Sequence, residues 1–248
     1  MILSIITINY NDEKGLVKTI ASVRNLLLKI KKIDIEFIII DGGSDDGSVD
    51  VINDNRNIIH KSVSEKDHGI YDAMNKGVNI ASGDYVLFMN SGDVLYYGFN
   101  EKMLPNIVSD DEIYTYNNIV KISNIFIPRD IKVGMMPCHQ AMIIPRKVLV
   151  VNKFDLNFRI AADYKLNKKI LSELKIIHND EYICINELGG ISNNWPSFSK
   201  LYLHIRELVT IDNLSSFPKY KLILSMFFKF ICIKIIGYKY FYILRLLK

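Results

Sequence analysis

The chain contains 248 residues, of which 49% are hydrophobic and 23% are charged, and its formal net charge is +4. This composition excludes a disordered chain and predicts a globular protein, either one large domain or one domain plus an appendage. The positive charge gathers at the C-terminal end. From Phe198 onward the chain has nine lysines and arginines against two acidic residues, so the part before Phe198 is slightly acidic.

Three cysteines, Cys138, Cys184 and Cys232, are scattered without CxxC spacing. An odd and unpatterned count favours a reducing compartment and argues against a zinc site. The first residues, MILSIITINYN, lack the basic start of a signal peptide and run directly into a strand-like pattern. We therefore expect a cytoplasmic protein.

Four segments in the N-terminal part have strand-like patterns, and helical patterns separate them. The last of the four is a continuous apolar run, as expected of a strand that is buried on both faces. The strand-like segments are 3–8, 35–40, 58–63 and 85–89, and the helical patterns are 16–30, 49–55 and 73–81. This order predicts an α/β fold with a doubly wound, mostly parallel sheet and right-handed crossovers. Because ligands of such sheets bind at the carboxyl ends of the strands, the polar segments that follow the strands form the candidate site.

Three segments between 67 and 93 form one pattern: D-H-G-I-Y-D-A-M-N-K-G from Asp67, A-S-G-D-Y-V from Ala81, and N-S-G-D from Asn90. The pattern resembles glycosyltransferase family 2, whose members use nucleotide-sugar donors, and the resemblance runs from about Leu3 to about Ser192. It implies the type A fold of nucleotide-diphospho-sugar transferases. The pattern is similar to that of bacterial glycosyltransferases of surface-polysaccharide synthesis.

The resemblance also implies a nucleotide site. Asp41, in the Gly-rich acidic turn after the second strand, matches the aspartate that contacts the base, usually uracil, and Asp67 matches a residue near the ribose and base. The implied nucleotide-binding residues are Thr7, Asn9, Tyr10, Asn11, Asp41, Asp67, Gly69 and Asn75. From the residues alone, the turn at Asp41 also fits a tight turn that caps the next helix, and Asp67 fits a surface carboxylate.

The turn Asn90–Asp93 departs from the family. Relatives commonly carry a second aspartate at its first or third position, where this chain has Asn90 and Gly92, so Asp93 is the remaining carboxylate. A hard divalent cation can take one protein carboxylate together with substrate phosphates and water. We expect Mg²⁺ or Mn²⁺ at Asp93, with Asn90 able to supply a carbonyl oxygen. The alternative is a plain turn without metal.

Two further side chains complete the predicted site. His139, in a His-Gln pair before an apolar strand, is expected to face the diphosphate or the acceptor, or else to be a hydrogen-bonded structural histidine. Asp163, in Ala-Asp-Tyr at the start of a helical pattern, matches the family's general base, although an acid is also favoured there by the helix N-terminus. Gly189 and Gly190 are expected to allow close approach of the backbone to substrate.

We expect residues 1–197 to form the catalytic domain, with a nucleotide-binding half to about 95 and an acceptor-binding half after it. Residues 198–248 are expected to form a basic amphipathic helical tail whose apolar runs are too short to span a membrane. The pattern favours an interfacial helix pair on the anionic inner face of the plasma membrane. A hairpin packed on the body, or a homodimer contact, is the alternative, and nucleic-acid binding is disfavoured.

The predicted function is an inverting glycosyltransferase that moves a sugar from a nucleotide-diphospho-sugar, expected to be a UDP-sugar, to a hydroxyl of a lipid-linked glycan. Because the metal motif is incomplete, the alternative function is an inactive nucleotide-sugar-binding or scaffold subunit at the membrane. A nucleotidylyltransferase would need a Gly-rich, basic loop after the first strand, and Asn9–Asp12 is not such a loop.

Overall fold

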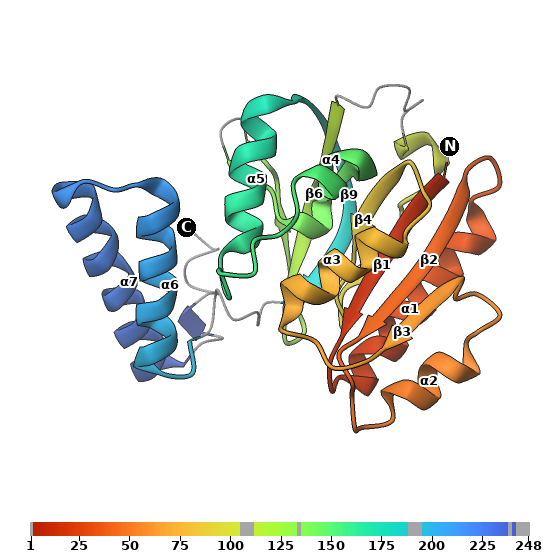
Figure 1. Ribbon diagram of the computed structural model, residues 1–248, viewed down its shortest axis with the longest axis horizontal. Coiled ribbons are helices and arrows are strands. Elements are labelled where there is room, and N and C mark those ends of the chain that lie inside the picture. Colours follow the sequence, from red (N-terminus) through yellow and green to blue (C-terminus); the bar gives the residue numbers. More distant parts are fainter. Residues whose placement is uncertain (1, 105–111, 133–134, 188–194, 238–239, 242–248) are drawn as a thin grey trace.

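The computed structural model of the chain (Figure 1) describes residues 2–104, 112–132, 135–187, 195–237 and 240–241. The predicted glycine pair, Gly189 and Gly190, lies outside the described residues, as does the end of the tail.

The first half of the sheet is parallel, as predicted. Its four strands are ordered β3-β2-β1-β4, and each neighbouring pair is parallel. Their bounds are Ile2–Asn9 for β1, Asp34–Asp41 for β2, Lys61–Ser64 for β3 and Tyr85–Phe88 for β4. The third strand begins at Lys61 instead of Ile58, because residues 55–58 form a turn after the preceding helix. The carboxyl ends of β1, β2 and β4 therefore meet at one edge.

The second half of the sheet is mixed. Strand β8 pairs antiparallel with β4, β6 pairs antiparallel with β8, and β9 runs parallel to β6. The bounds are Val94–Leu95 for β5, Glu112–Ile122 for β6, Ile125–Arg129 for β7, Met142–Pro145 for β8 and Lys175–Glu187 for β9. Strands β6 and β7 form an antiparallel hairpin.

Helices cover both faces of the sheet (Figure 1). Leu3 and Ile5 of β1 pack in one hydrophobic cluster with α1 and α2, and the alternate residues Ile6 and Ile8 pack in a second cluster with α3, α4 and α5. The helices are Glu13–Lys29 (α1), Ser48–Asp54 (α2), Ile70–Ile80 (α3), Arg146–Val151 (α4) and Ala162–Glu173 (α5). This arrangement confirms the doubly wound fold.

Gly77 sets the distance between α3 and the sheet. A Cβ at this position would lie 2.5 Å from Ile6 Cγ2, and Ile6 is fully buried. We expect Gly77→Ala to destabilise the protein by about 1–2 kcal/mol, because overpacking costs more than the roughly 1 kcal/mol that alanine gains in a helix. Urea unfolding measures the change. Asn79→Ala, on the exposed side of the same helix, is the control and should be neutral or stabilising. An equally stable Gly77→Ala variant would contradict the close approach.

The tail forms a helical hairpin of α6 (Phe198–Asp212) and α7 (Ser216–Ile236). A third hydrophobic cluster joins its inner side to the body and contains Val120 and Ile122 of β6, Leu201 of α6, and Met226 of α7. The hairpin is therefore packed on the catalytic body. Within the described residues, no helix combines the length and apolar character that crossing a membrane requires.

Candidate active site

Two adjoining cavities open at the carboxyl edge of the parallel strands, with volumes of about 660 Å³ and about 630 Å³. Both fall within the usual range of ligand sites. They share Asp12, Ile70, Asn90 and Ser91, so the turn after β4 divides one space into two compartments.

Four of the predicted nucleotide-binding residues line the first cavity: Asn9, Tyr10, Asp67 and Gly69. The Tyr10 side chain is 67% exposed, which leaves its ring free to stack on a ligand. Gly69 has φ +117° and open space where a Cβ would stand, so the N-terminus of α3 faces the cavity unobstructed. Helix N-termini favour anions because their free N–H groups and dipole carry positive charge.

Asp67 is the predicted carboxylate at this cavity, which Asp12 also lines. Its Oδ1 lies 2.5 Å from Lys76 Nζ. Burial raises the pKa of Asp67, and Lys76 opposes part of that rise. The side chain is 8% exposed, which suits a hydrogen-bond acceptor that is shielded from water.

Asp41 lies beneath the cavity and is fully buried. Its carboxylate accepts hydrogen bonds from Asn9 Nδ2 (2.7 Å), the Ser44 hydroxyl (2.6 Å) and N–H (3.0 Å), and the Ser64 hydroxyl (2.6 Å). Burial would raise the pKa of Asp41, but these donors outweigh it and the pKa is lowered. The structure thus shows Asp41 joining the loops after β1, β2 and β3. A contact between Asp41 and a base stays a prediction.

Three other predictions require correction. Thr7 lies within β1, is fully buried, and does not reach the cavity. Asn11 has φ +49° and exchanges hydrogen bonds with Ser44 and Asp45 instead of facing the cavity. Asn75 pairs with the backbone of Phe154, donating to its carbonyl (2.9 Å) and accepting from its N–H (3.0 Å), so it fastens α3 to the segment before α5.

The turn Asn90–Asp93 is fixed to α1 by the buried hydroxyl of Thr19. This hydroxyl lies 2.7 Å from the Asp93 carbonyl oxygen and accepts from the Gly92 N–H at 3.1 Å. Gly92 has φ +91°, and a side chain at this position would begin 3.7 Å from Asp12 Oδ2. Backbone geometry therefore favours glycine at the position where relatives commonly carry aspartate, and an acid there would stand beside Asp12.

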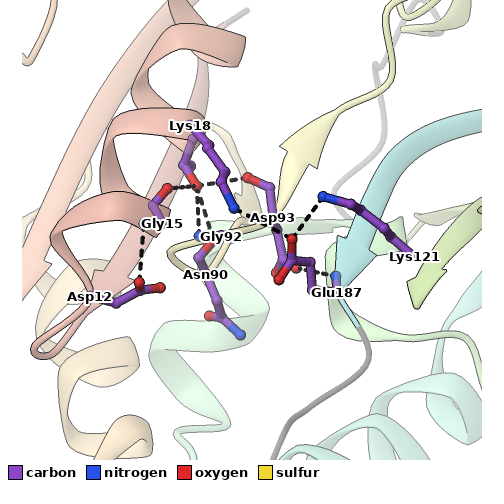
Figure 2. A network of polar contacts seen from close by, with 9 residues as sticks. Asp12, Gly15, Lys18, Asn90, Gly92, Asp93, Lys121 and Glu187 are labelled. Atoms are coloured by element: carbon purple, nitrogen blue, oxygen red, sulfur yellow. Dashed lines mark hydrogen bonds and ion pairs between the residues drawn. The ribbon is translucent and has the colours of Figure 1, made fainter. Parts of the chain in front are cut away.

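Asp93 is 5% exposed and turns its carboxylate toward the second cavity. It accepts hydrogen bonds from Gln140 Nε2 (2.9 Å) and from the Glu187 N–H (3.3 Å). Figure 2 shows it between the N-terminal part of α1 and the side chains of Lys121 and Glu187, which form an ion pair at 2.9 Å. Burial raises the pKa of Asp93 to about 6, so a nearby cation would stabilise its charged form.

A short 3-10 helix, His139–Ala141, connects Asp93 and Asp163, two of the acids that line the second cavity. Gln140 binds Asp93, whereas His139 Nδ1 lies 3.5 Å from Asp163 Oδ2 and its Nε2 lies 3.3 Å from Asn90 Nδ2. Burial alone would lower the pKa of His139, but the contact with Asp163 outweighs it and raises the pKa. His139 is therefore part of the site in the second cavity.

Asp163, in the first turn of α5, lines the same cavity as Asp93. Its Oδ1 accepts from the Tyr71 hydroxyl (2.8 Å) and the Tyr164 N–H (2.9 Å), and its side chain remains 30% exposed. Burial would raise the pKa of Asp163, but His139 and Tyr71 outweigh it and the pKa is lowered. The carboxylate is thus ionised at neutral pH, partly accessible, and held in one orientation.

The sequence of residues 4–160 matches the family model described as glycosyl transferase family 2. This chain belongs to that family. The transferase is 28% identical over 184 residues to the PGL/p-HBAD biosynthesis glycosyltransferase of Mycobacterium bovis, an alignment that covers 64% of this chain and 68% of the relative.

Solved structures show that the fold of the transferase is the type A glycosyltransferase fold. It is similar to Staphylococcus aureus TarS 1–349 in complex with UDP, with a TM-score of 0.62 and 16% identity over 92% of this chain and 71% of that one. It is also similar to the mannosyltransferase PcManGT of Pyrobaculum calidifontis in complex with GDP-Man and Mn²⁺, with a TM-score of 0.59 and 13% identity over 90% of this chain and 68% of that one.

The donor set of the transferase at the turn fits a hard divalent cation. Asn90 Oδ1 is buried without a hydrogen-bond partner, and the Asp93 carboxylate is held nearby at a raised pKa. Among the residues that the structure describes, no group of three His, Cys, Asp or Glu side chains gathers to hold a metal ion. The two oxygen ligands therefore suit a cation that takes its other ligands from substrate phosphates and water.

Three side chains that contribute contacts at the site of the transferase were not predicted from the sequence. Tyr71 and Gln140 stand inside segments that had been singled out, but nothing in their spacing shows that they contact Asp163 and Asp93. Glu207 of α6 accepts hydrogen bonds from the backbone that precedes Asp163, and only its position as one of two acids in a basic tail sets it apart. Each contact joins segments far apart in the sequence.

Proposed function

We propose that this transferase moves a sugar from a nucleotide-diphospho-sugar, preferably a UDP-sugar, to a hydroxyl group with inversion at the anomeric carbon. The observation that carries the proposal is the second cavity, which places an ionised, oriented carboxylate, Asp163, in the same space as Asp93. The first cavity adds an exposed tyrosine ring, a carboxylate and an open helix N-terminus, the groups that suit a base, a ribose and a diphosphate. TarS has been solved with UDP and with UDP-GlcNAc, and the shared fold supports the same class of donor here.

In the proposed reaction, the acceptor hydroxyl oxygen forms a bond to the anomeric carbon while the bond from that carbon to the diphosphate oxygen breaks. The proton of the hydroxyl passes to Asp163, and the bonding electron pair leaves with the diphosphate. Such a positioned base typically contributes about 10²–10⁴-fold to the rate. A single displacement inverts the configuration, so an α-linked donor gives a β-linked product.

Tyr71 adapts to both protonation states of Asp163. Its hydroxyl lies 2.8 Å from Asp163 Oδ1 and 2.7 Å from the Ile160 carbonyl oxygen, and it carries one proton. It donates to the ionised carboxylate before transfer. After Asp163 is protonated, Tyr71 can donate to Ile160 and accept from the acid. His139, whose pKa the contact with Asp163 raises, supports the ionised form from the other side.

A bound Mg²⁺ or Mn²⁺ would be held by Asp93 and the free Asn90 oxygen and would neutralise the charge of the leaving diphosphate. PcManGT was solved with GDP-Man and Mn²⁺, and the shared fold supports a divalent cation in this chain. The protein itself contributes the contact between the Thr19 hydroxyl of α1 and the Asp93 carbonyl oxygen, which keeps the turn Asn90–Asp93 in place.

A donor screen tests the proposal. The protein is incubated with UDP-, GDP- and dTDP-sugars, with MnCl₂ and a panel of octyl glycosides, and the release of nucleotide diphosphate is measured. We expect turnover with at least one UDP-sugar. Binding of a nucleotide-sugar in thermal-shift assays without any release would instead support the inactive, nucleotide-sugar-binding subunit.

We further propose that the acceptor is a lipid-linked glycan of surface-polysaccharide assembly, reached from the inner face of the plasma membrane. The support is the outer face of α7. Five large apolar residues share one side of this helix at helical spacing and are each 65–81% exposed: Phe217, Tyr220, Leu224, Phe228 and Ile235. The helix also contains four lysines and no acidic residue, as expected of a helix that lies on an anionic bilayer.

Vesicle binding tests the membrane proposal. We expect Leu224→Ser with Phe228→Ser to weaken binding to phosphatidylcholine vesicles with 30% phosphatidylglycerol by at least about tenfold, because each side chain contributes about 1.5–3 kcal/mol on burial. Higher salt should weaken wild-type binding. Val151→Ser, at an 81% exposed residue of α4, is the matched control. Equal binding of the wild type, the double variant and Val151→Ser contradicts the proposal. If the wild type forms a dimer and the double variant does not, the outer face of α7 is a homodimer contact instead.

A further inference from the structure

Helix α6 brings a buried carboxylate to the backbone that precedes the base. Glu207 is 4% exposed, and its oxygens accept hydrogen bonds from the N–H groups of Arg159 (2.7 Å), Ile160 (3.0 Å) and Ala161 (2.9 Å). Three consecutive backbone donors on one carboxylate fix the course of this segment, because hydrogen bonds to a charged group are the stronger kind.

These contacts support the start of α5 from outside the helix. Helix α5 begins after Ala161, which has no side chain that could cap the helix. The N–H of an N-cap residue has no partner within its own helix, and a negative charge near a helix N-terminus is stabilising. Glu207 supplies both an acceptor and the charge from a different helix, so the start of α5 depends on α6.

Residues 159–161 lead directly into the first turn of α5, which contains the proposed base Asp163. The carbonyl oxygen of Ile160 lies 2.7 Å from the Tyr71 hydroxyl, which also lies 2.8 Å from Asp163 Oδ1. Glu207 thus holds the N–H groups of the segment while Tyr71 contacts its carbonyl oxygen and the acid. We propose that Glu207 is a positioning residue that fixes the orientation of Asp163 in the acceptor cavity. This inference rests on the proposed role of Asp163 as general base.

Other contacts of α6 support the same conclusion. Asp212 accepts from the Tyr164 hydroxyl at 3.0 Å and pairs with Lys168 at 2.6 Å, so α6 is fastened along α5 at a second point (Figure 1). His204 and Leu208 of α6 line the cavity that contains Asp163. The predicted boundary at residue 197 therefore does not separate the acceptor site from the tail. Helix α6 is a wall of that site.

The experiment compares Glu207→Gln and Glu207→Asp with Arg206→Gln, a change at the neighbouring exposed residue of α6. Hydrogen–deuterium exchange follows the amides of residues 159–161. UDP affinity, turnover and the pH profile of kcat are measured with the donor and octyl glycoside that the wild type uses. The aspartate variant keeps the charge and loses one methylene, so it remains informative if the glutamine variant unfolds.

We expect Glu207→Gln to expose the three amides to exchange, to keep UDP affinity within about twofold, and to lower kcat by about 10²-fold, the cost of a displacement of about 1 Å at a reacting group. The acidic limb of its pH profile should move upward, because a displaced Asp163 loses contacts that lower its pKa. Glu207→Asp should lie between the wild type and the glutamine variant, and Arg206→Gln should match the wild type.

Unchanged exchange of residues 159–161 in both Glu207 variants overturns the inference, as does increased exchange with an unchanged kcat and pH profile. A loss of UDP affinity equal to the loss of kcat overturns it too, because it would show a general structural defect. A wild type that turns over none of the donors refutes the proposed function. The exchange data distinguish that outcome, since they do not depend on turnover.

Discussion

Asp163→Asn should lower kcat by about 10²–10⁴-fold while UDP affinity stays within about twofold of the wild type. The amide can still accept the hydrogen bonds of Tyr71 and Tyr164, so the variant keeps the shape of the site but cannot take the acceptor's proton. The measurement is steady-state turnover together with UDP binding by calorimetry.

Asp155→Asn is the matched control. Its side chain is 30% exposed, like that of Asp163, and it pairs with Lys165 of α5 at 2.6 Å, but it lines neither of the two cavities. We expect it to keep most of the wild-type turnover. Near-wild-type turnover of Asp163→Asn would show that another group takes the proton.

The pH dependence follows from the lowered pKa of Asp163. The base works only when ionised, so the loss of kcat through protonation of Asp163 should begin only below the usual carboxyl range, measured at saturating MnCl₂ so that Asp93 stays ionised. Tyr71→Phe removes one of the donors that lower this pKa, and it should shift the acidic limb to higher pH. A limb that does not move would exclude Tyr71 as a partner of the ionised base.

Asp93→Asn should lower Mn²⁺-dependent UDP affinity by at least about tenfold, because changes even to outer-shell partners of metal ligands typically cost 10–100-fold. An amide offers one neutral oxygen where the carboxylate offers charge, and a hard cation prefers the charged oxygen. UDP titrations with MnCl₂ and with EDTA separate the effect on metal from the effect on nucleotide, and we expect the EDTA values of the variant and wild type to agree.

Glu187→Gln is the control for this prediction. Its backbone N–H contacts Asp93, but its side chain pairs with Lys121 and Lys18. We expect it to retain the metal-dependent affinity. If Asp93→Asn also retained it, Asp93 would be a structural acid that holds Gln140, and the turn would bind no cation.

The parallel half of the fold followed from local patterns. Tyr85–Met89 is a continuous apolar run, the other strands are mostly apolar, and the helices between them show apolar residues at three- and four-residue spacing. Asp12, directly before α1, is a residue type that caps helices, and it accepts from the Gly15 N–H at 3.0 Å. Caps and periodicity depend on neighbours in the chain, so one sequence suffices to find them.

The direction in which a polar side chain points was harder to predict. Thr7 and Asn75 stand in segments that border the site, yet Thr7 faces the interior beside α1 and Asn75 pairs with Phe154. Asp41 and Asp67 both follow the pattern of the family, but the structure buries Asp41 among protein donors and turns Asp67 to the cavity. Neighbouring residues of a strand or helix point their side chains in different directions, so a shift by one residue changes whether a side chain faces the cavity.

Period and turn chemistry along the chain were enough to establish the presence and parallel arrangement of β1 to β4, the edge where the polar turns gather, and the acids that stand there. The order of these strands in the sheet came from the structure. The long-range folding of the second half brought Asp93 and Asp163 into one cavity, because the adjacent residues His139 and Gln140 each hold one of them. It also placed Glu207 of the tail against the start of α5. Contacts of this kind form between residues that share no local pattern, so their geometry exists only when the chain is folded.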